Sequence, residues 1–122
     1  MRQSRILHAT SRLTLATFIL GLVLAGPLYS AEKAKVCARY QTNSGWSKGY
    51  SVQANVMKGI ELIQKTHNYN YMSHATYVVI FWDRGEASLI ELDFPALSAV
   101  PMKGTDQDGR KWEVAKTNIC YM

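Results

Sequence analysis

The 122-residue chain lacks the short motifs that identify many enzymes. It contains no Gly-x-Ser-x-Gly nucleophile elbow, no glycine-rich phosphate loop and no dinucleotide-binding fingerprint. Pairs of carboxylates can be drawn from it, as from any domain of this size, but nothing in their surroundings predicts that their pKa values separate into an acid and a base. We therefore expect a protein without catalytic activity and without a cofactor.

Cysteine is also scarce, because Cys37 and Cys120 are the only two in the chain. Neither lies near the N-terminal segment, where a lipid anchor would need one. In an exported protein an even pair of cysteines is normally bridged. The Cα atoms of a disulfide lie about 4.4 to 6.8 Å apart. A Cys37–Cys120 bridge therefore predicts that the first and last structured segments are neighbours, and it leaves no thiol for Cys-His catalysis.

The N-terminal segment has no acidic residue and reads as a secretory signal peptide. Residues 1–12 contain three arginines, and thirteen uncharged residues follow at 13–25 before Gly26-Pro27. This run is shorter than the roughly twenty apolar residues that a membrane span needs, so an uncleaved anchor is the weaker alternative. We expect residues 1–30 to be removed, with cleavage after Ser30 or Ala31. The mature protein would then be periplasmic or secreted, with no membrane span.

Residues 31–122 are enough for one small domain. Three of the 14 basic residues lie in the predicted signal peptide, which leaves eleven against nine acids and a formal net charge of +2. The lysines are scattered along the chain rather than clustered. A weak, dispersed positive charge is not the electrostatic pattern of a nucleic-acid-binding protein, so we expect no nucleic-acid partner.

The stretch 77–94 predicts a β-hairpin. Two runs rich in β-branched and aromatic residues flank Asp83-Arg84-Gly85-Glu86, where Gly85 can adopt the positive φ of a tight turn. The first run is apolar on both faces, so something must cover both. The second run alternates and predicts one buried face, formed by Ser88, Ile90, Leu92 and Phe94.

Further short strands complete the predicted fold. They are expected at 36–42, 50–56 and 60–66 and within 110–121, whereas 67–74 reads as a loop and 103–109 as a polar turn. About five to seven short strands with Gly and Pro between them predict an all-β domain, either a small SH3-like or OB-like antiparallel barrel or a compact sandwich. An α+β alternative remains open, in which 52–65 forms one amphipathic helix despite Gly59.

The aromatic residues are the main functional signal. Trp46, Tyr50, Tyr69 and Tyr71 lie in polar surroundings where an exposed aromatic surface is expected, while Trp82 and Trp112 are assigned to the core. We interpret the four residues as the contact surface of a binding module that recognises a protein or a cell-envelope component. The alternative is an inhibitor of an extracellular or periplasmic hydrolase, which would present the loop 67–74 to the enzyme.

A metal site is a third and weaker hypothesis. His67, Met72 and His74 could ligate a soft transition metal such as copper. Their spacing matches no compact ligand motif, and metal sites normally need three or four ligands. Asp106-Gln107-Asp108-Gly109 resembles part of a calcium loop but lacks the remaining oxygen ligands, so we interpret it as an ordinary turn.

Overall fold

The computed structural model describes residues 31–122, and the predicted signal peptide lies outside these residues. Seven strands and one helix follow one another along this part of the chain. Their bounds are β1 Glu32–Thr42, β2 Gly45–Trp46, β3 Tyr50–Lys58, α2 Gly59–Thr66, β4 Thr76–Phe81, β5 Ala87–Leu92, β6 Met102–Thr105 and β7 Lys111–Lys116. The helix has eight residues, and no helix in the described part of the chain is long and apolar enough to cross a membrane.

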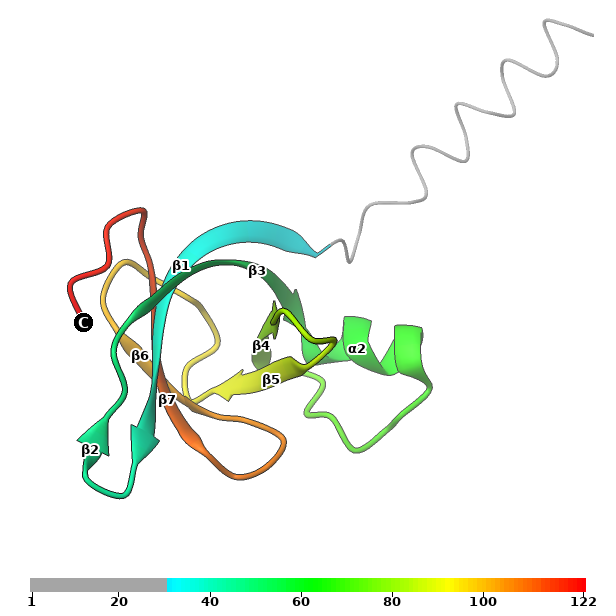
Figure 1. Ribbon diagram of the computed structural model, residues 1–122. Helices are drawn as coiled ribbons and strands as arrows, with labels where there is room; N and C mark the ends of the chain where they lie inside the picture. Colours follow the sequence, from blue (N-terminus) through cyan, green and yellow to red (C-terminus); the bar gives the residue numbers. More distant parts are fainter. Residues whose placement is uncertain (1–30) are drawn as a thin grey trace, which may run out of the picture.

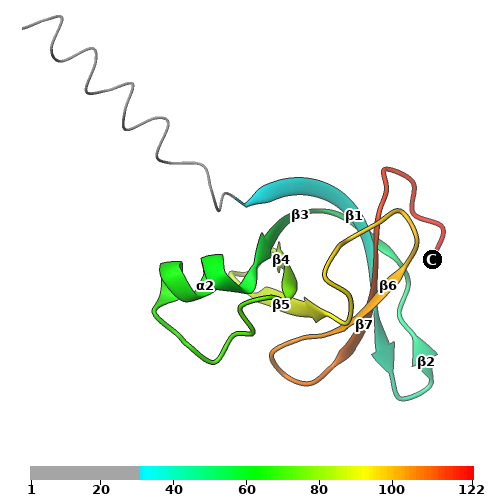
Figure 2. The same cartoon turned by 180° about the vertical axis from the view of Figure 1, so that it is seen from behind.

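Six of the strands form a closed antiparallel barrel (Figures 1 and 2). Strands β1, β3, β4, β5, β6 and β7 pair in that order, and β7 returns to pair with β1 from Val36↔Lys116 to Tyr40↔Trp112. The two-residue strand β2 only extends the end of β1. The predicted small antiparallel barrel is therefore confirmed. Closure leaves no unpaired edge along the main sheet.

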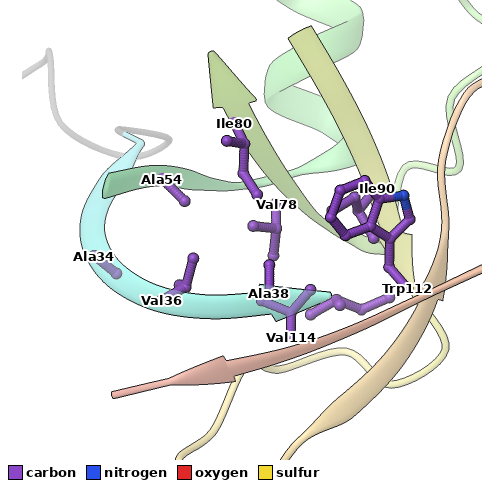
Figure 3. Packing of buried hydrophobic residues seen from close by; sticks show 10 residues of the cluster. Ala34, Val36, Ala38, Ala54, Val78, Ile80, Ile90, Trp112 and Val114 are labelled. Carbon is purple, nitrogen blue, oxygen red and sulfur yellow. The ribbon is translucent and has the colours of Figure 1, made fainter. Parts of the chain in front are cut away.

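Alternating side chains of the six strands fill the barrel interior. Figure 3 shows residues of β1, β4 and β7 pointing toward one another in the barrel interior. The buried cluster consists of Ala34, Val36, Ala38, Ala54, Val78, Ile80, Ile90, Leu92, Trp112 and Val114. Interior space is thus filled by protein, and any ligand site must lie at an end of the barrel or on its outside.

The predicted hairpin around Gly85 is confirmed. Arg84 and Gly85 both have positive φ, 71° and 76°, and the N–H of Trp82 donates to the carbonyl of Glu86 at 2.8 Å. Phe94 does not share the buried face of β5 as predicted; it is 61% exposed. The strand ends at Leu92, and the chain then turns away, so the alternation on which that prediction rested no longer applies.

Strand β4 is buried on both faces from Thr76 to Ile80, as its composition predicts, but Phe81 at its end is 69% exposed and is not covered as predicted. Val78 and Ile80 point into the barrel, while Tyr77 and Val79 face outward and are only 4% and 5% exposed. The connection from α2 covers Tyr77, because Tyr71 packs edge-on against its ring and the N–H of Met72 donates to its hydroxyl. The cover that the sequence required is thus supplied by the chain itself.

Residues 60–66 form a helix, so the predicted strand there is wrong. The alternative helix over 52–65 is wrong as well, because β3 runs to Lys58 and α2 begins at Gly59. A Cβ atom on Gly59 would lie 1.8 Å from the carbonyl oxygen of Met72, so the glycine permits a close approach at the start of the helix. Its presence marks the boundary between the two elements.

Strand β6 falls partly within the segment 103–109, which we predicted to be a turn. It runs from Met102 directly after Pro101, and a Cβ atom on Gly104 would lie 2.7 Å from the carbonyl oxygen of Glu91. A glycine inside a strand commonly marks such a close backbone approach. The last strand is also shorter than predicted, because β7 ends at Lys116.

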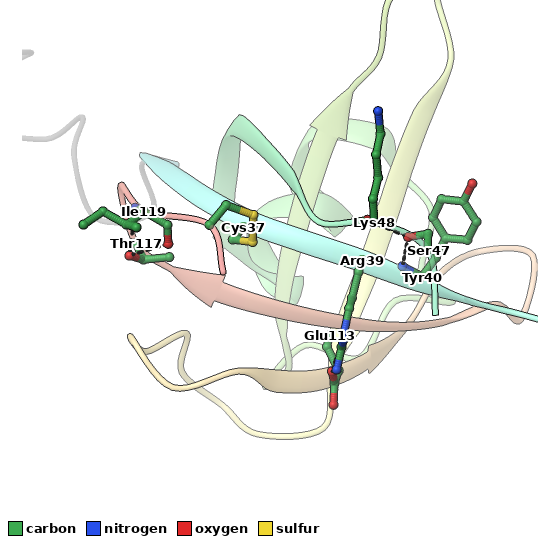
Figure 4. The surroundings of a disulfide bond; sticks show 9 residues. Cys37, Arg39, Tyr40, Ser47, Lys48, Glu113, Thr117 and Ile119 are labelled. Atoms are coloured by element: carbon green, nitrogen blue, oxygen red, sulfur yellow. Dashed lines mark hydrogen bonds and ion pairs between the residues drawn. A yellow bond between two sulfur atoms is a disulfide. The ribbon is translucent and has the colours of Figure 1, made fainter. Parts of the chain in front are cut away.

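The predicted disulfide joins Cys37 of β1 to Cys120 in the C-terminal segment (Figure 4). Their Cα atoms are 5.1 Å apart, and Cys37 is 1% exposed on the outside of the barrel. Gly49 lies against the bridge, where a Cβ atom would be 2.8 Å from the sulfur of Cys120. The bridge therefore fastens the C-terminal segment over the β1–β7 seam.

Candidate functional site

The four aromatic residues proposed from the sequence lie in two separate places. Trp46 and Tyr50 belong to β2 and β3, whereas Tyr69 and Tyr71 belong to the α2–β4 connection. These elements lie at opposite ends of the molecule in Figures 1 and 2. The structure therefore does not bring the four residues into one surface.

A larger aromatic group gathers at the end of the barrel where the β1–β3, β4–β5 and β6–β7 connections lie, which we call the hairpin end. Its members are Tyr40, Tyr50, Trp82 and Trp112, which we call the aromatic cluster. Neighbouring ring centroids lie 5.3 to 6.2 Å apart: Tyr40–Trp112 5.3 Å, Tyr50–Trp82 5.6 Å, Tyr40–Tyr50 6.2 Å and Trp82–Trp112 6.2 Å. Each ring contacts two others, so the four form a continuous wall.

Strand register and internal hydrogen bonds hold these rings in place. Tyr40 lies opposite Trp112 across the closing β1–β7 ladder. The indole N–H of Trp112 donates to the carboxylate of Asp106 at 2.8 Å, and that of Trp82 donates to the hydroxyl of Ser88 at 2.9 Å. Because both indole N–H groups are engaged within the protein, the cluster offers a ligand apolar ring faces rather than indole donors.

The aromatic cluster lines a cavity of about 330 Å³. The β4–β5 and β6–β7 connections form its rim, which carries Glu86, Asp106, Gln107, Asp108 and Arg110. Trp112 is only 2% exposed and forms the floor, whereas Tyr40, Tyr50 and Trp82 are partly exposed. Concave sites that combine aromatic rings with a few polar groups are the usual form of small-ligand pockets, and this cavity has both kinds of lining.

Two rim residues are occupied in holding the β6–β7 turn. One carboxylate oxygen of Asp106 accepts from the backbone N–H groups of Asp108 and Arg110, and the other accepts from Trp112. The side-chain amide of Gln107 bonds to strand β5, with its nitrogen donating to the carbonyl of Ala87 at 2.7 Å. The predicted turn at 106–109 is thus a fixed wall of the cavity.

Cationic side chains already lie against two of the rings. The guanidinium of Arg110 is 4.8 Å from the ring centroid of Tyr40, and the ammonium of Lys48 is 5.2 Å from that of Tyr50. Hydrogen bonding with Tyr40, together with desolvation, raises the pKa of the Tyr50 hydroxyl above its ordinary value of 10.0. At neutral pH this hydroxyl is therefore protonated and can donate as well as accept.

The loop predicted for a metal or an inhibitory contact lies at the other end of the barrel. Tyr69 is 79% and Met72 61% exposed, and both histidines are exposed. Backbone bonds from Gly59 to Ala75 and from Ile60 to Ser73 tie the loop to the start of α2. Within residues 31–122 no group of three or more His, Cys, Asp or Glu side chains could hold a metal ion, so metal binding by His67, Met72 and His74 stays a prediction.

One buried charge belongs neither to the aromatic cluster nor to the loop 67–74. Glu61 of α2 is 3% exposed, and its Oε2 accepts no hydrogen bond from the described residues, although the ammonium of Lys65 lies 3.3 Å away. The Lys65 side chain is itself 60% exposed, and Glu61 lines a cavity of about 380 Å³ together with Lys58, Thr76 and Lys116.

Sequence reasoning placed Tyr50 at a contact surface but did not connect it with Tyr40, Trp82 and Trp112. A signal for the cluster was nevertheless present, because Tyr40, Trp82 and Trp112 each lie within three positions of a turn sequence, at 43–45, 83–86 and 106–109. In an antiparallel barrel alternate turns lie at the same end, so aromatic residues beside those turns converge.

Comparison of the chain with protein-family models, curated proteins and solved structures finds no match.

Proposed function

We propose that the protein is an exported, non-catalytic binding module that recognises a protein or a cell-envelope component through the aromatic cluster at the hairpin end. The Cys37–Cys120 disulfide is compatible with an oxidising, exported compartment. The predicted signal peptide at 1–30 agrees with the same location.

The observation that carries this proposal is the cavity wall of Tyr40, Tyr50 and Trp82. These rings are partly exposed although the interior of the same barrel is densely filled. Partly exposed aromatic rings that line a cavity contribute strongly to binding, because they bury a large area at little conformational cost. Hydrogen bonds of Asp106 and Gln107 hold the turn at 106–109 in place beside the cavity, so little order has to be gained there on binding.

A second candidate function is inhibition of a hydrolase by the α2–β4 connection. Tyr69 and Met72 project there from a loop whose two ends are tied to α2 and β4. A braced loop with an exposed aromatic tip suits insertion into an enzyme cleft, because little order has to be gained on binding.

One experiment tests both candidates. Wild type, Tyr50→Ala and Tyr69→Ala would be used to capture partners from the native envelope, and thermal unfolding would verify that each variant is folded. We expect Tyr50→Ala to lose a partner that wild type and Tyr69→Ala retain. Loss with Tyr69→Ala alone would instead favour the inhibitor. Equal recovery by all three proteins would contradict both candidates.

A further inference from the structure

The cavity at the hairpin end contains enough chemistry to restrict the class of ligand. Its lining combines the aromatic cluster with three carboxylates and one guanidinium, from Glu86, Asp106, Asp108 and Arg110. Some of these groups are already hydrogen-bonded within the protein, and the others are available to a ligand. The chemistry of the available groups determines which class of ligand can bind.

An anionic ligand is disfavoured by the charge of the lining. Three carboxylates against one guanidinium give the lining a formal charge of −2, or −1 when the ammonium of Lys48 over the Tyr50 ring is included. A carboxylate or phosphate ligand would have to approach this excess of negative charge in a partly desolvated site, where like charges repel more strongly than in water.

A cation that stacks on the rings is disfavoured for a different reason. The electron-rich faces that would attract it are already used, by Arg110 over Tyr40 and by Lys48 over Tyr50. An incoming ammonium group would have to displace these side chains or lie beside them. Both tyrosines of the cavity wall therefore already carry a cation, whereas Trp82 does not.

The free polar groups suit a ligand that both donates and accepts. Asp106 is fully engaged by backbone and indole N–H groups. Glu86 and Asp108 are exposed, and neither takes part in the three ion pairs found between residues 31 and 122. Their carboxylates can accept from hydroxyl groups, while Arg110 can donate to hydroxyl oxygens.

We infer that this cavity binds an uncharged carbohydrate, an inference that rests on the proposed function of the aromatic cluster. The apolar C–H face of a pyranose ring packs against Trp82, a partly exposed ring with no cation beside it among residues 31–122, and its hydroxyls bond to Glu86, Asp108 and Arg110. A volume of about 330 Å³ is at the lower end of the range for small-ligand sites. The site therefore takes a short stretch of glycan rather than a folded protein.

The test is a titration of the disulfide-bonded mature protein with cellotriose, maltotriose and chitotriose, followed by NMR of the tryptophan indole N–H signals. We expect at least one of these neutral sugars to shift the signals of Trp82 and Trp112 but not that of Trp46. Because no net charge is brought together, the affinity should be the same at low and high salt.

Variants assign the binding to the named groups. The double variant Glu86→Gln, Asp108→Asn should weaken the affinity about tenfold, since it replaces two charged acceptors by neutral ones. Asp83→Asn is the matched control, because Asp83 is exposed in the same β4–β5 turn but does not line the cavity. Its affinity should equal that of wild type, and equal loss in the control and the double variant would overturn the assignment.

Three ligands that are not neutral sugars provide the opposing outcomes. Choline, tri-arginine and trigalacturonate represent an organic cation, a basic peptide and an anionic glycan. Tighter binding of any of these than of every neutral sugar would overturn the carbohydrate inference. If no neutral sugar binds while Tyr50→Ala still loses its envelope partner, the inference fails and the proposed function stands.

Discussion

Tyr40 of β1 and Trp112 of β7 lie opposite each other across the ladder that closes the barrel, and their ring centroids are 5.3 Å apart. The same contact completes the sheet and joins two members of the aromatic cluster. Trp112 also belongs to the buried core, whereas Tyr40 is partly exposed. The candidate site is therefore part of the barrel closure and not an addition to a finished fold.

Replacing Trp112 should destabilise the protein strongly. The side chain is 2% exposed, and Trp112→Ala would leave a cavity in the core and an unpaired Asp106 carboxylate oxygen. We expect the free energy of unfolding to fall by about 3 to 5 kcal/mol, as measured by urea denaturation.

The matched control is Trp46→Ala. Trp46 is 37% exposed, and its main contact is the guanidinium of Arg39 at 4.9 Å from the ring centroid. Removal of the Trp46 side chain should lower the free energy of unfolding by about 1 kcal/mol or less. Similar losses for the two variants would show that Trp112 is not a core residue.

The disulfide should supply a large part of the stability. It links positions 83 residues apart, and closing a loop of that length stabilises by about 4 to 5 kcal/mol in the chain-entropy model. The variant Cys37→Ala, Cys120→Ala should therefore unfold at a much lower urea concentration than wild type. Mass spectrometry after alkylation would verify that wild type has no free thiol. A difference below about 1 kcal/mol would contradict this role of the bridge.

Stability should decrease at high pH because of Tyr77. Burial raises the pKa of its hydroxyl from 10.0 to about 12, and the hydrogen bond that it donates to Glu91 at 2.7 Å acts in the same direction. Below pH 10 the hydroxyl is protonated in the folded and unfolded states alike. Between about pH 10 and 12 only the unfolded state loses the proton, so the free energy of unfolding falls by about 1.4 kcal/mol per pH unit.

Tyr77→Phe isolates this contribution from that of other groups that titrate in the same range. The variant has no hydroxyl to ionise, so its free energy of unfolding should fall less steeply than that of wild type from pH 10 upward. The comparison requires urea denaturation of both proteins at several pH values. Parallel curves over this range would exclude Tyr77 as the cause.

Gly59 should not tolerate a side chain. A Cβ atom there would lie 1.8 Å from the carbonyl oxygen of Met72, and relief of that clash would move the α2–β4 connection. We expect Gly59→Ala to lower the free energy of unfolding by about 1 to 3 kcal/mol. Gly85→Asn is the control, because no atom lies within 4 Å of its Cβ position and asparagine tolerates positive φ. An equal fall in the free energy of unfolding for both variants would argue against a clash between a side chain at position 59 and the Met72 carbonyl.

Local signals predicted β1, β3, β4, β5 and β7 and the β4–β5 hairpin, because these elements depend on neighbours in sequence. Alternation with period two identifies one buried face, and Gly85 supplies the positive φ that its turn needs. The segment 60–66 was predicted wrongly because a short apolar run fits a strand and a helix equally well. In the structure the helix begins at Gly59, which closely approaches Met72, thirteen positions away.

Strand β6 shows the same limit. Its four residues contain a glycine, and they directly follow Pro101, so the local sequence favours a turn. The segment is a strand because β5 and β7 lie on either side and pair with it. Pairing partners from elsewhere in the chain outweighed the local preference.

The sequence by itself determined that this is a small β domain whose ends are joined by Cys37 and Cys120. Alternation and turn residues can be read from short segments, and two cysteines allow only one intramolecular pairing. Only the tertiary structure decided which aromatic residues meet. Closure of the barrel brings Tyr40, Tyr50, Trp82 and Trp112 together and separates Tyr50 from Tyr69 and Tyr71. Such proximity follows from strand order and register across the whole sheet, which no single segment specifies.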